Sequence, residues 1–573
     1  MQKGGIIGQF LKLLPGQPGF GVNELWRQIH IMKEIKRVFK VNGKPFFPIG
    51  GQTHNSSGYD DKASEMAFKA VKLMHANTLE IPVYWNIIEP EEGKFDFTSV
   101  DALLASARRY EVKLILLWFG TWKNGNMDYA PAWVKTNPQR FKRVISPTGK
   151  QIWVLSSHCR ANLEADKKAF TALCKHLKAK DSGDETVIGF QIQNEPGIMG
   201  SDRDYGPEAQ AIFDSPVPSE FITAMKKTGK GPIYNTWQQS GGKETGTWPQ
   251  LFGWEAGEYM TAWSVASYIN SIAKSGKAVY DLPMYLNVWL MGKGWWPLAG
   301  EAYPSGGAVT KVLDIHKWFT PNVDMVSPDA HVAETKVYEA VCEAYARDDN
   351  PFFMPETGAG ANSHSWNMFR GIADYNSLGD FFFGIEKVIA EDGSARPETQ
   401  MVVDSVRCAA AAIPLLLKYQ GTGKVHAVIQ EDLSSSDFYN FEGYMGLVEF
   451  GGRKAGYSGK DWQHATYGGP IERTEPNRGR GLIIQANKNE FYLVGANYRL
   501  FLRPQPALDN MQPRLAIMDT APKLPGWYIV SVDEGHFDEK GEFVIDRWRN
   551  GDEIDPAVWV EPDCGVVRVI TCD

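Results

Sequence analysis

Two glutamates, each at the end of a short apolar segment, are the residues of this chain best suited to acid–base chemistry. Residues 187–193 (VIGFQIQ) predict a buried strand, because apolar residues dominate and no charge interrupts them. Asn194 and Glu195 follow, and Pro196, which lacks an N–H group, ends the strand. Residues 352–355 (FFMP) predict a second short strand, with Glu356 directly after it. In parallel α/β folds, chemistry takes place at these carboxyl ends of the strands.

A pair of carboxyl groups at one mouth suits the hydrolysis of a glycosidic bond. One group protonates the leaving oxygen, and the other attacks the anomeric carbon or activates a water molecule. Asn194 is placed to bind the sugar 2-hydroxyl. Each glutamate has a structural alternative, namely a helix cap for Glu195 and a strand-end ion pair for Glu356. The occurrence of both at equivalent strand ends favours the catalytic hypothesis.

Alternating strands and helices predict the scaffold that would bring the two glutamates together. Eight β units with helices between them are typical of a (β/α)8 barrel, in which all strands end at the same mouth. The expected strands span 46–50, 78–85, 113–119, 187–193, 284–289, 323–328, 352–355 and 380–384, and the expected helices span 62–75, 99–110, 165–179, 255–275, 308–317, 335–347 and 366–375.

The remaining segments predict an insertion and a second domain. Residues 200–254, rich in Gly, Pro, Ser and Trp, indicate a large insertion at the active site. After a helix expected at 398–419, short apolar runs alternate with Gly, Asn and Asp turns, which is typical of a β-sandwich. We therefore expect an N-terminal extension (1–37), a catalytic barrel (38–420) and a C-terminal β-sandwich (421–573).

Composition and charge exclude several classes of function. The net charge of −8 is spread over 573 residues without long runs, which argues against nucleic acid as a partner. The chain has no run of 18 apolar residues, so no membrane span is expected, and without a clear signal-peptide cleavage site we expect a cytoplasmic protein. The six cysteines form no CxxC pair, and His54, His331 and His364 lack metal-ligand spacing. We therefore expect free thiols, no metal and no cofactor.

Longer motifs resemble a known family. Residues 78–97 (TLEIPVYWNIIEPEEGKFDF) resemble the second-strand signature of glycoside hydrolase family 35, the β-galactosidases. Residues 114–125 (LILLWFGTWKNG) and 131–133 (PAW) are similar to its bacterial branch with a short accessory domain, as are residues 50–57 and 200–207. The resemblance implies a retaining, exo-acting enzyme with Glu195 as acid/base and Glu356 as nucleophile, and it implies no metal.

Further polar and aromatic residues fall at the expected mouth of the barrel. Asp329 and His331 follow the sixth strand, where a polar group can orient the nucleophile. A tryptophan at the end of the third strand can stack on a sugar ring. The predicted substrate-binding residues are Asn55, Asn86, Trp122, Lys123, Asn124, Asn194, Asn287 and His331.

Departures from the family pattern leave the sugar open. Pro82 stands where many members carry a tyrosine, and Asn124 stands where many carry a glutamate. We expect a β-galactosidase that acts on oligosaccharides. The alternatives are a β-glucosidase, a glycosyl-transferring enzyme on the same scaffold, or a non-catalytic carbohydrate-binding protein. The partner is a glycoside or oligosaccharide, and the N-terminal extension or the sandwich is compatible with a homo-oligomer.

Overall fold

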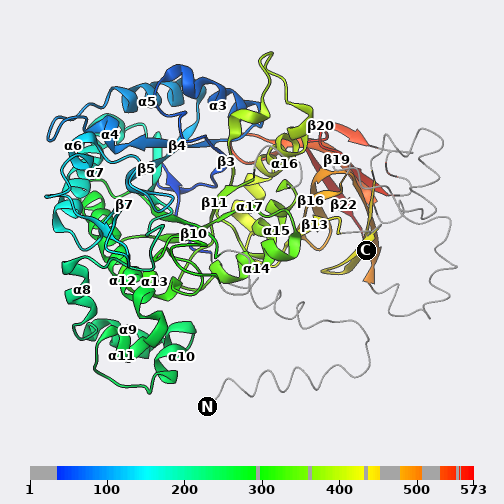
Figure 1. Ribbon diagram of the computed structural model, residues 1–573. Coiled ribbons are helices and arrows are strands. Elements are labelled where there is room, and N and C mark those ends of the chain that lie inside the picture. Colours follow the sequence, from blue (N-terminus) through cyan, green and yellow to red (C-terminus); the bar gives the residue numbers. More distant parts are fainter. Residues whose placement is uncertain are drawn as a thin grey trace.

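The computed structural model describes residues 35–291, 297–358, 364–431, 436–451, 478–505, 529–549, 554 and 557–572, so most of the expected N-terminal extension lies outside the described residues. Eight parallel strands close into a barrel, as the sequence predicts (Figure 1). The order around the barrel follows the chain, and the last strand pairs with the first. The barrel strands are β3 (Ile49–Gln52), β4 (Thr78–Tyr84), β5 (Lys113–Lys123), β8 (Val187–Asn194), β9 (Met284–Val288), β10 (Met325–Ala330), β11 (Met354–Thr357) and β12 (Asp380–Phe383).

A short hairpin leads into the barrel. Strands β1 (Lys40–Val41) and β2 (Lys44–Pro45) are joined by Asn42 and Gly43, whose φ angles of 51° and 70° match the two-residue turn that the Asn-Gly pair predicts. Phe39 packs inside the barrel against Phe353, with ring centroids 5.2 Å apart. Burial of such a ring contributes about 1.5–3 kcal/mol to the stability of the fold. The Phe39 ring closes the lower end of the barrel.

Helices surround the barrel and bury their apolar sides against it. Helix α3 begins after Asp60, whose side chain accepts a hydrogen bond from the Ala63 N–H group, and its buried residues include Phe68 and Val71. The surrounding helices are α3 (Asp61–Leu73), α4 (Trp85–Ile88), α5 (Thr98–Tyr110), α7 (Arg160–Asp181), α12 (Ala256–Lys277), α13 (Leu313–Phe319), α14 (Thr335–Tyr345) and α15 (Asn367–Asp374).

The helix expected at 398–419 is broken in two. A 3-10 turn (Pro397–Thr399) leads into α16 (Gln400–Ala411), and α17 (Ile413–Tyr419) follows at an angle of 56°. Pro414 lies in the first turn of α17, where its missing N–H group costs no hydrogen bond, whereas inside one continuous helix it would remove one. Among the described residues no single helix has the length and hydropathy of a membrane span, and this bent pair meets those criteria only jointly.

The insertion forms a small helical layer of its own. It contains α8 (Pro207–Phe213), α9 (Ser219–Thr228), α10 (Pro232–Gln239) and α11 (Trp248–Phe252), at the lower left of Figure 1. Phe221 and Trp248 are fully buried in its apolar cluster, which also includes residues of α12 and α13. Two further short elements, α6 (Ala132–Lys135) and the hairpin β6 (Arg143–Ile145) and β7 (Gln151–Leu155), occupy the connection after β5.

Two antiparallel sheets form the C-terminal domain, at the right of Figure 1. One sheet has the order β13-β16-β17-β22-β19-β20 and the other β14-β15-β18-β21, and both contribute to one apolar cluster. This agrees with the predicted sandwich. The strands are β13 (Val425–Ile429), β14 (Ser436–Phe441), β15 (Tyr444–Phe450), β16 (Arg480–Asn487), β17 (Glu490–Ala496), β18 (Tyr498–Pro504), β19 (Ile529–Phe537), β20 (Phe543–Arg549), β21 (Val558–Val560) and β22 (Val566–Thr571).

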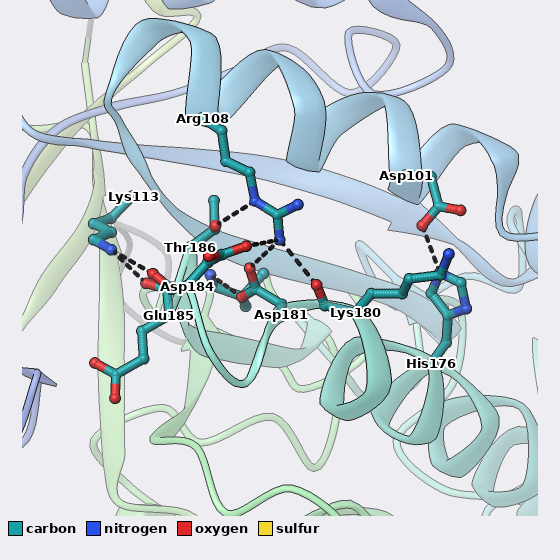
Figure 2. Close-up of polar contacts among 10 residues, drawn as sticks. Asp101, Arg108, Lys113, His176, Lys180, Asp181, Asp184, Glu185 and Thr186 are labelled. Carbon is teal, nitrogen blue, oxygen red and sulfur yellow. Dashed lines mark hydrogen bonds and ion pairs between the residues drawn. The ribbon is translucent and has the colours of Figure 1, made fainter.

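A polar network fixes the start of β8, the strand that carries Glu195. The buried carboxylate of Asp181 accepts a hydrogen bond of 2.7 Å from the Val187 N–H group and lies 2.8 Å from the Arg108 guanidinium (Figure 2). Arg108 also contacts Asp184 at 2.9 Å. The network joins the last turns of α5 and α7 to the first residue of β8, so it sets the register of that strand. All six cysteines are free thiols, as predicted.

Candidate active site

Glu195 and Glu356 lie at the same mouth of the barrel, at the ends of β8 and β11. Both are nearly buried, with 4% and 6% of their surface exposed. Asp329, at the end of β10, lies close to both: it is the register partner of Glu356 on the adjacent strand, and its charge helps to raise the pKa of Glu195. Barrel closure therefore places three carboxyl groups in one small volume.

The backbone around Glu195 is held in an uncommon conformation. Glu195 and Gln193 have φ angles of 44° and 65°, in the left-handed region that glutamate and glutamine seldom adopt. Such a conformation costs on the order of 1–3 kcal/mol and persists where surrounding contacts impose it. Here the Glu195 N–H group donates to the Asn287 carbonyl at 3.1 Å, and the Glu195 carbonyl accepts from Gly125 at 3.0 Å. These contacts turn the glutamate at the strand end into the mouth.

A buried aspartate of α7 organises the same region from behind. Asp166 accepts four hydrogen bonds of 2.6–2.9 Å, from the Trp118 indole, the Thr121 N–H and hydroxyl groups, and the Gln193 amide. The contacts hold an irregular stretch of β5, whose pairing with β8 shifts register between Trp118 and Lys123. Gly120 lies in this stretch, where a Cβ atom would approach the Asp166 carboxylate to 2.8 Å.

Glu195 has the environment of a carboxylic acid that retains its proton. Burial first, and then the charges of Asp329 and Glu356, raise the pKa of Glu195 well above its ordinary value, while Lys123 opposes the shift. The Asn124 amide donates to Glu195 Oε2 at 2.6 Å. Burial and Glu356 also raise the pKa of Asp329, but the adjacent His331 favours its anion. Of the two carboxyl groups, we therefore expect Glu195 and not Asp329 to carry the proton.

Two side chains face Glu356, one from strand β9 and one from the residue that follows strand β10. The Asn287 amide of β9 donates to Glu356 Oε2 at 2.8 Å. His331 Nε2 lies 3.5 Å from Glu356 Oε1 and 3.0 Å from Asp329 Oδ1. Burial opposes the charge of His331, but the two carboxylates outweigh it and raise the pKa of His331 to about 10. At neutral pH a cation thus faces Glu356.

Asp329, His331 and Glu356 are also the kind of side chains that bind metals. Their ligand atoms lie within 4.8 Å of one another. In this structure His331 Nε2 lies 3.0 Å from Asp329 Oδ1 and 3.5 Å from Glu356 Oε1, so the three side chains form an ion cluster.

Two more predicted residues join the site. Lys123 Nζ donates to Asn194 Oδ1 at 2.7 Å, and both side chains are nearly buried. This contact orients the Asn194 amide, whose Nδ2 atom is buried without a hydrogen-bond partner among the described residues. Asn194 therefore has a donor to offer to a hydroxyl group of a ligand.

Three other predicted substrate-binding residues differ in position from Lys123 and Asn194. Trp122 is 1% exposed and packs against Tyr268 on the helix side of the barrel wall, so its ring has no free face for a sugar. The predicted contact between Trp122 and substrate is thus not supported by its position. Asn55 is half-buried, and its carbonyl accepts from the Tyr84 hydroxyl at 2.6 Å. Asn86 lies in α4, with its side-chain oxygen buried and without a partner among the described residues.

A second layer of polar groups lies below the mouth, and it was not predicted from the sequence. Glu80 of β4 is fully buried and accepts from Gln52 at 3.1 Å and from the Tyr285 hydroxyl at 2.9 Å. Burial raises the pKa of Glu80 well above its ordinary value. Gln52 also donates to the carbonyl of Pro355, the residue before Glu356, at 3.2 Å. The sequence signal for Glu80 was a single charged residue inside an otherwise apolar strand. The signal for Asp166 was likewise a charged residue in the buried stripe of α7.

The fold and the site define a class of protein. A (β/α)8 barrel with two glutamates of unlike environment at its mouth is the architecture of many glycoside hydrolases. Comparison with known proteins agrees: residues 54–240 match the model of glycoside hydrolase family 42, described as beta-galactosidase. Residues 407–561 match a domain of unknown function, DUF5597.

Individual relatives are of the same type. The chain is 28% identical over 178 residues to human beta-galactosidase-1-like protein 3, covering 30% of this chain and 24% of that protein. It is 26% identical over 200 residues to a beta-galactosidase of Xanthomonas manihotis, covering 34% of this chain and 30% of the relative. The chain thus spans less than a third of the length of these curated relatives.

Solved structures with a similar chain path include a beta-galactosidase from Bacillus circulans sp. alkalophilus (15% identity, TM-score 0.45, 66% of this chain and 58% of that one). The catalytic domain of beta-amylase from Paenibacillus polymyxa is another (11% identity, TM-score 0.46, 64% of this chain and 98% of that one). The sequence matches support a relationship with β-galactosidase-type glycosidases of the group that includes families 35 and 42. The assignment to family 35 itself stays a prediction.

Proposed function

We propose that the protein is a retaining, exo-acting β-glycosidase, specifically a β-galactosidase that releases terminal galactose from oligosaccharides. The observation that carries the proposal is the unlike environment of Glu195 and Glu356 at one mouth. Glu195 is protonated by burial and by neighbouring carboxylates, whereas Glu356 is surrounded by the donors Asn287 and His331. The sequence similarity to β-galactosidases supports the choice of sugar and anomer.

In the proposed double displacement each group has a separate role. In the first step a carboxylate oxygen of Glu356 attacks the anomeric carbon, the glycosidic C–O bond breaks, and the proton of Glu195 passes to the leaving oxygen. Asn194 Nδ2 hydrogen-bonds the 2-hydroxyl group of the sugar. In the second step Glu195, now ionised, takes a proton from water, which attacks the anomeric carbon and releases Glu356. The raised pKa of Glu195 favours its protonated form, and activity should fall as the pH rises through that pKa.

Substitution of each glutamate distinguishes the two roles. We expect Glu356→Ala to reduce kcat on an aryl β-galactoside by about 10⁴-fold or more with an unchanged circular dichroism spectrum, because the nucleophile is lost while the fold is retained. Added azide should then yield the α-galactosyl azide with Glu356→Ala and the β-galactosyl azide with Glu195→Ala, since azide takes the place of a different group in each. The control is Glu91→Ala, a largely exposed glutamate outside the mouth, which should keep full activity.

The outcome that refutes the assignment is near-normal turnover by Glu356→Ala. A screen of aryl β-galactosides, β-glucosides and β-mannosides, with and without acceptor sugars, tests the sugar and separates hydrolysis from glycosyl transfer. Galactoside hydrolysis is the expected result. A protein that binds galactosides and hydrolyses none of these substrates would be a carbohydrate-binding protein, and the proposal would be wrong.

A further inference from the structure

Asp329 is a third carboxyl group in a mouth where a double displacement requires only two. It ends β10 and sits beside Glu356 of β11, its register partner on the adjacent strand. Its side chain is 16% exposed and lies 3.0 Å from His331 Nε2, which in turn lies 3.5 Å from Glu356 Oε1. The negative charge of Asp329 also helps to raise the pKa of Glu195, so Asp329 is coupled to both glutamates.

A third carboxylate in a buried site is unfavourable unless its charge is balanced, because like charges repel strongly there. The charged and titratable groups that face this cluster are Lys123 of β5, His331 after β10, the buried Glu80 and Tyr285, which interact with Glu356, and His364, which interacts with His331. Burial raises the pKa of Glu80, which favours its neutral form, and burial together with His331 lowers the pKa of His364, which favours the neutral form of that residue.

With Glu195 protonated, the charges cancel. Asp329 and Glu356 supply two negative charges, and Lys123 and His331 supply two positive charges. After the first step of the proposed reaction, Glu356 is a neutral glycosyl ester and Glu195 has become a carboxylate. Two negative charges again balance two positive charges. Asp329 is the anion whose charge is the same in both states.

We propose that Asp329 is a positioning residue that accepts the hydrogen bond of the Glu195 carboxylic acid and holds the His331 cation against Glu356. The inference rests on the proposed glycosidase function and deepens it. Asp329 keeps Glu195 protonated before the first step and basic before the second, because its constant negative charge disfavours the Glu195 anion. Asp329 also keeps His331 in place while Glu356 is an ester, because the esterified Glu356 has no negative charge to attract the His331 cation.

The test is Asp329→Asn, which removes the charge and retains the shape. We expect the basic limb of the pH profile of kcat/KM to move down by about one pH unit or more, because Glu195 loses a neighbouring anion. We also expect the rate on an alkyl β-galactoside to fall at least about tenfold more than the rate on 2,4-dinitrophenyl β-galactoside, whose leaving group needs no proton. Equal losses on both substrates with an unmoved limb would overturn the proposal.

A second variant should shift the basic limb of the pH profile in the opposite direction. His331→Gln removes the cation and leaves Asp329 in place, so the basic limb should move up. The matched control is Asp380→Asn, the same chemical change at the start of barrel strand β12, where the buried Asp380 accepts a hydrogen bond from the Tyr338 hydroxyl. This control should leave both the pH profile and the ratio of the two substrates unchanged. A downward shift in His331→Gln would contradict the charge balance.

A measurement without turnover separates this inference from the proposed function. In protein labelled with ¹⁵N-histidine, we expect the His331 imidazole to stay protonated to about pH 10, as its pKa indicates. In Asp329→Asn the same resonance should titrate at lower pH. If the wild type hydrolyses no glycoside but His331 shows this shift, the proposed function fails and the Asp329–His331 contact stands. If the His331 titration is identical in both proteins, the role of Asp329 is refuted.

Discussion

Replacement of Asp166 by alanine should damage both the stability of the barrel and the placement of Glu195. Asp166 is fully buried in α7 and is the common acceptor for donors of β5 and β8. Alanine removes the acceptor and leaves a polar cavity behind the two strands. Because Gln193 directly precedes the Asn194-Glu195 pair, the effect reaches the active site through the backbone.

The magnitude follows from the donors that lose their partner. Four hydrogen bonds end on Asp166, but the Thr121 hydroxyl also contacts the Tyr268 hydroxyl at 2.8 Å and keeps that contact. The Trp118 indole, the Thr121 N–H group and the Gln193 amide have Asp166 as their hydrogen-bond acceptor. A buried donor without a partner costs about 1–3 kcal/mol, and water entering the cavity restores part of it. We expect a loss of about 3–5 kcal/mol in the free energy of unfolding of the barrel.

Urea unfolding followed by tryptophan fluorescence and by circular dichroism measures the loss. The control is Asp101→Ala on α5, which removes a carboxylate that is 46% exposed and lies 2.6 Å from His176 (Figure 2). An exposed ion pair of this kind contributes at most about 1 kcal/mol. Under conditions where Asp166→Ala remains folded, kcat on an aryl glycoside should fall about 100-fold, since a displacement of about 1 Å at the acid has that effect.

The reasoning is refuted if Asp166→Ala loses no more stability than Asp101→Ala. It is equally refuted if the variant is strongly destabilised but retains full kcat while folded. The first result would mean that the Asp166 hydrogen bonds contribute no net stability. The second would mean that Gln193 and Glu195 hold their conformation without α7.

Two further predictions concern the scaffold. Arg108→Ala leaves the buried Asp181 carboxylate without its cation, and we expect a loss of about 1–3 kcal/mol in urea unfolding, against less than about 1 kcal/mol for Arg109→Ala, a more exposed ion pair. Burial raises the pKa of Asp380 from 3.8 to about 8, so the folded state binds a proton that the unfolded state releases. The contribution of neutral Asp380 is complete below about pH 4, falls by about 1.4 kcal/mol per pH unit, and is lost above about pH 8. Asp380→Asn cannot ionise, so its stability relative to wild type should rise with that slope over the same window; a constant difference would contradict the shift.

The barrel was predictable because its signals are local. Most strands of the barrel contain a short apolar run, and the helices between them carry a buried stripe, so local patterns indicated all eight β units. The helices of the insertion were not indicated, because Gly and Pro residues obscure the period and their apolar faces pack mainly on one another, around Phe221 and Trp248. The break before Pro414 had a local signal, but the continuous run of Ala and Leu concealed it.

The site was predictable at its strand ends and less so elsewhere. Glu195 and Glu356 were indicated by the positions at which their strands stop. Asp166 and Glu80 act through partners distant in sequence, so their hydrogen bonds could not be anticipated from their neighbours. The position of Trp122 depends on the irregular pairing of β5 with β8, which turns its ring toward the helices.

The sequence by itself determined the barrel and the two strand-end glutamates, since apolar periodicity and the proline after Glu195 are properties of adjacent residues. Only the tertiary structure decided the environment that raises the pKa of Glu195. That environment combines burial with charges contributed by β5, β10 and β11, which barrel closure brings around Glu195. Electrostatic interactions act over distances of a few ångströms in space, and for Glu195 those neighbours are far away along the chain.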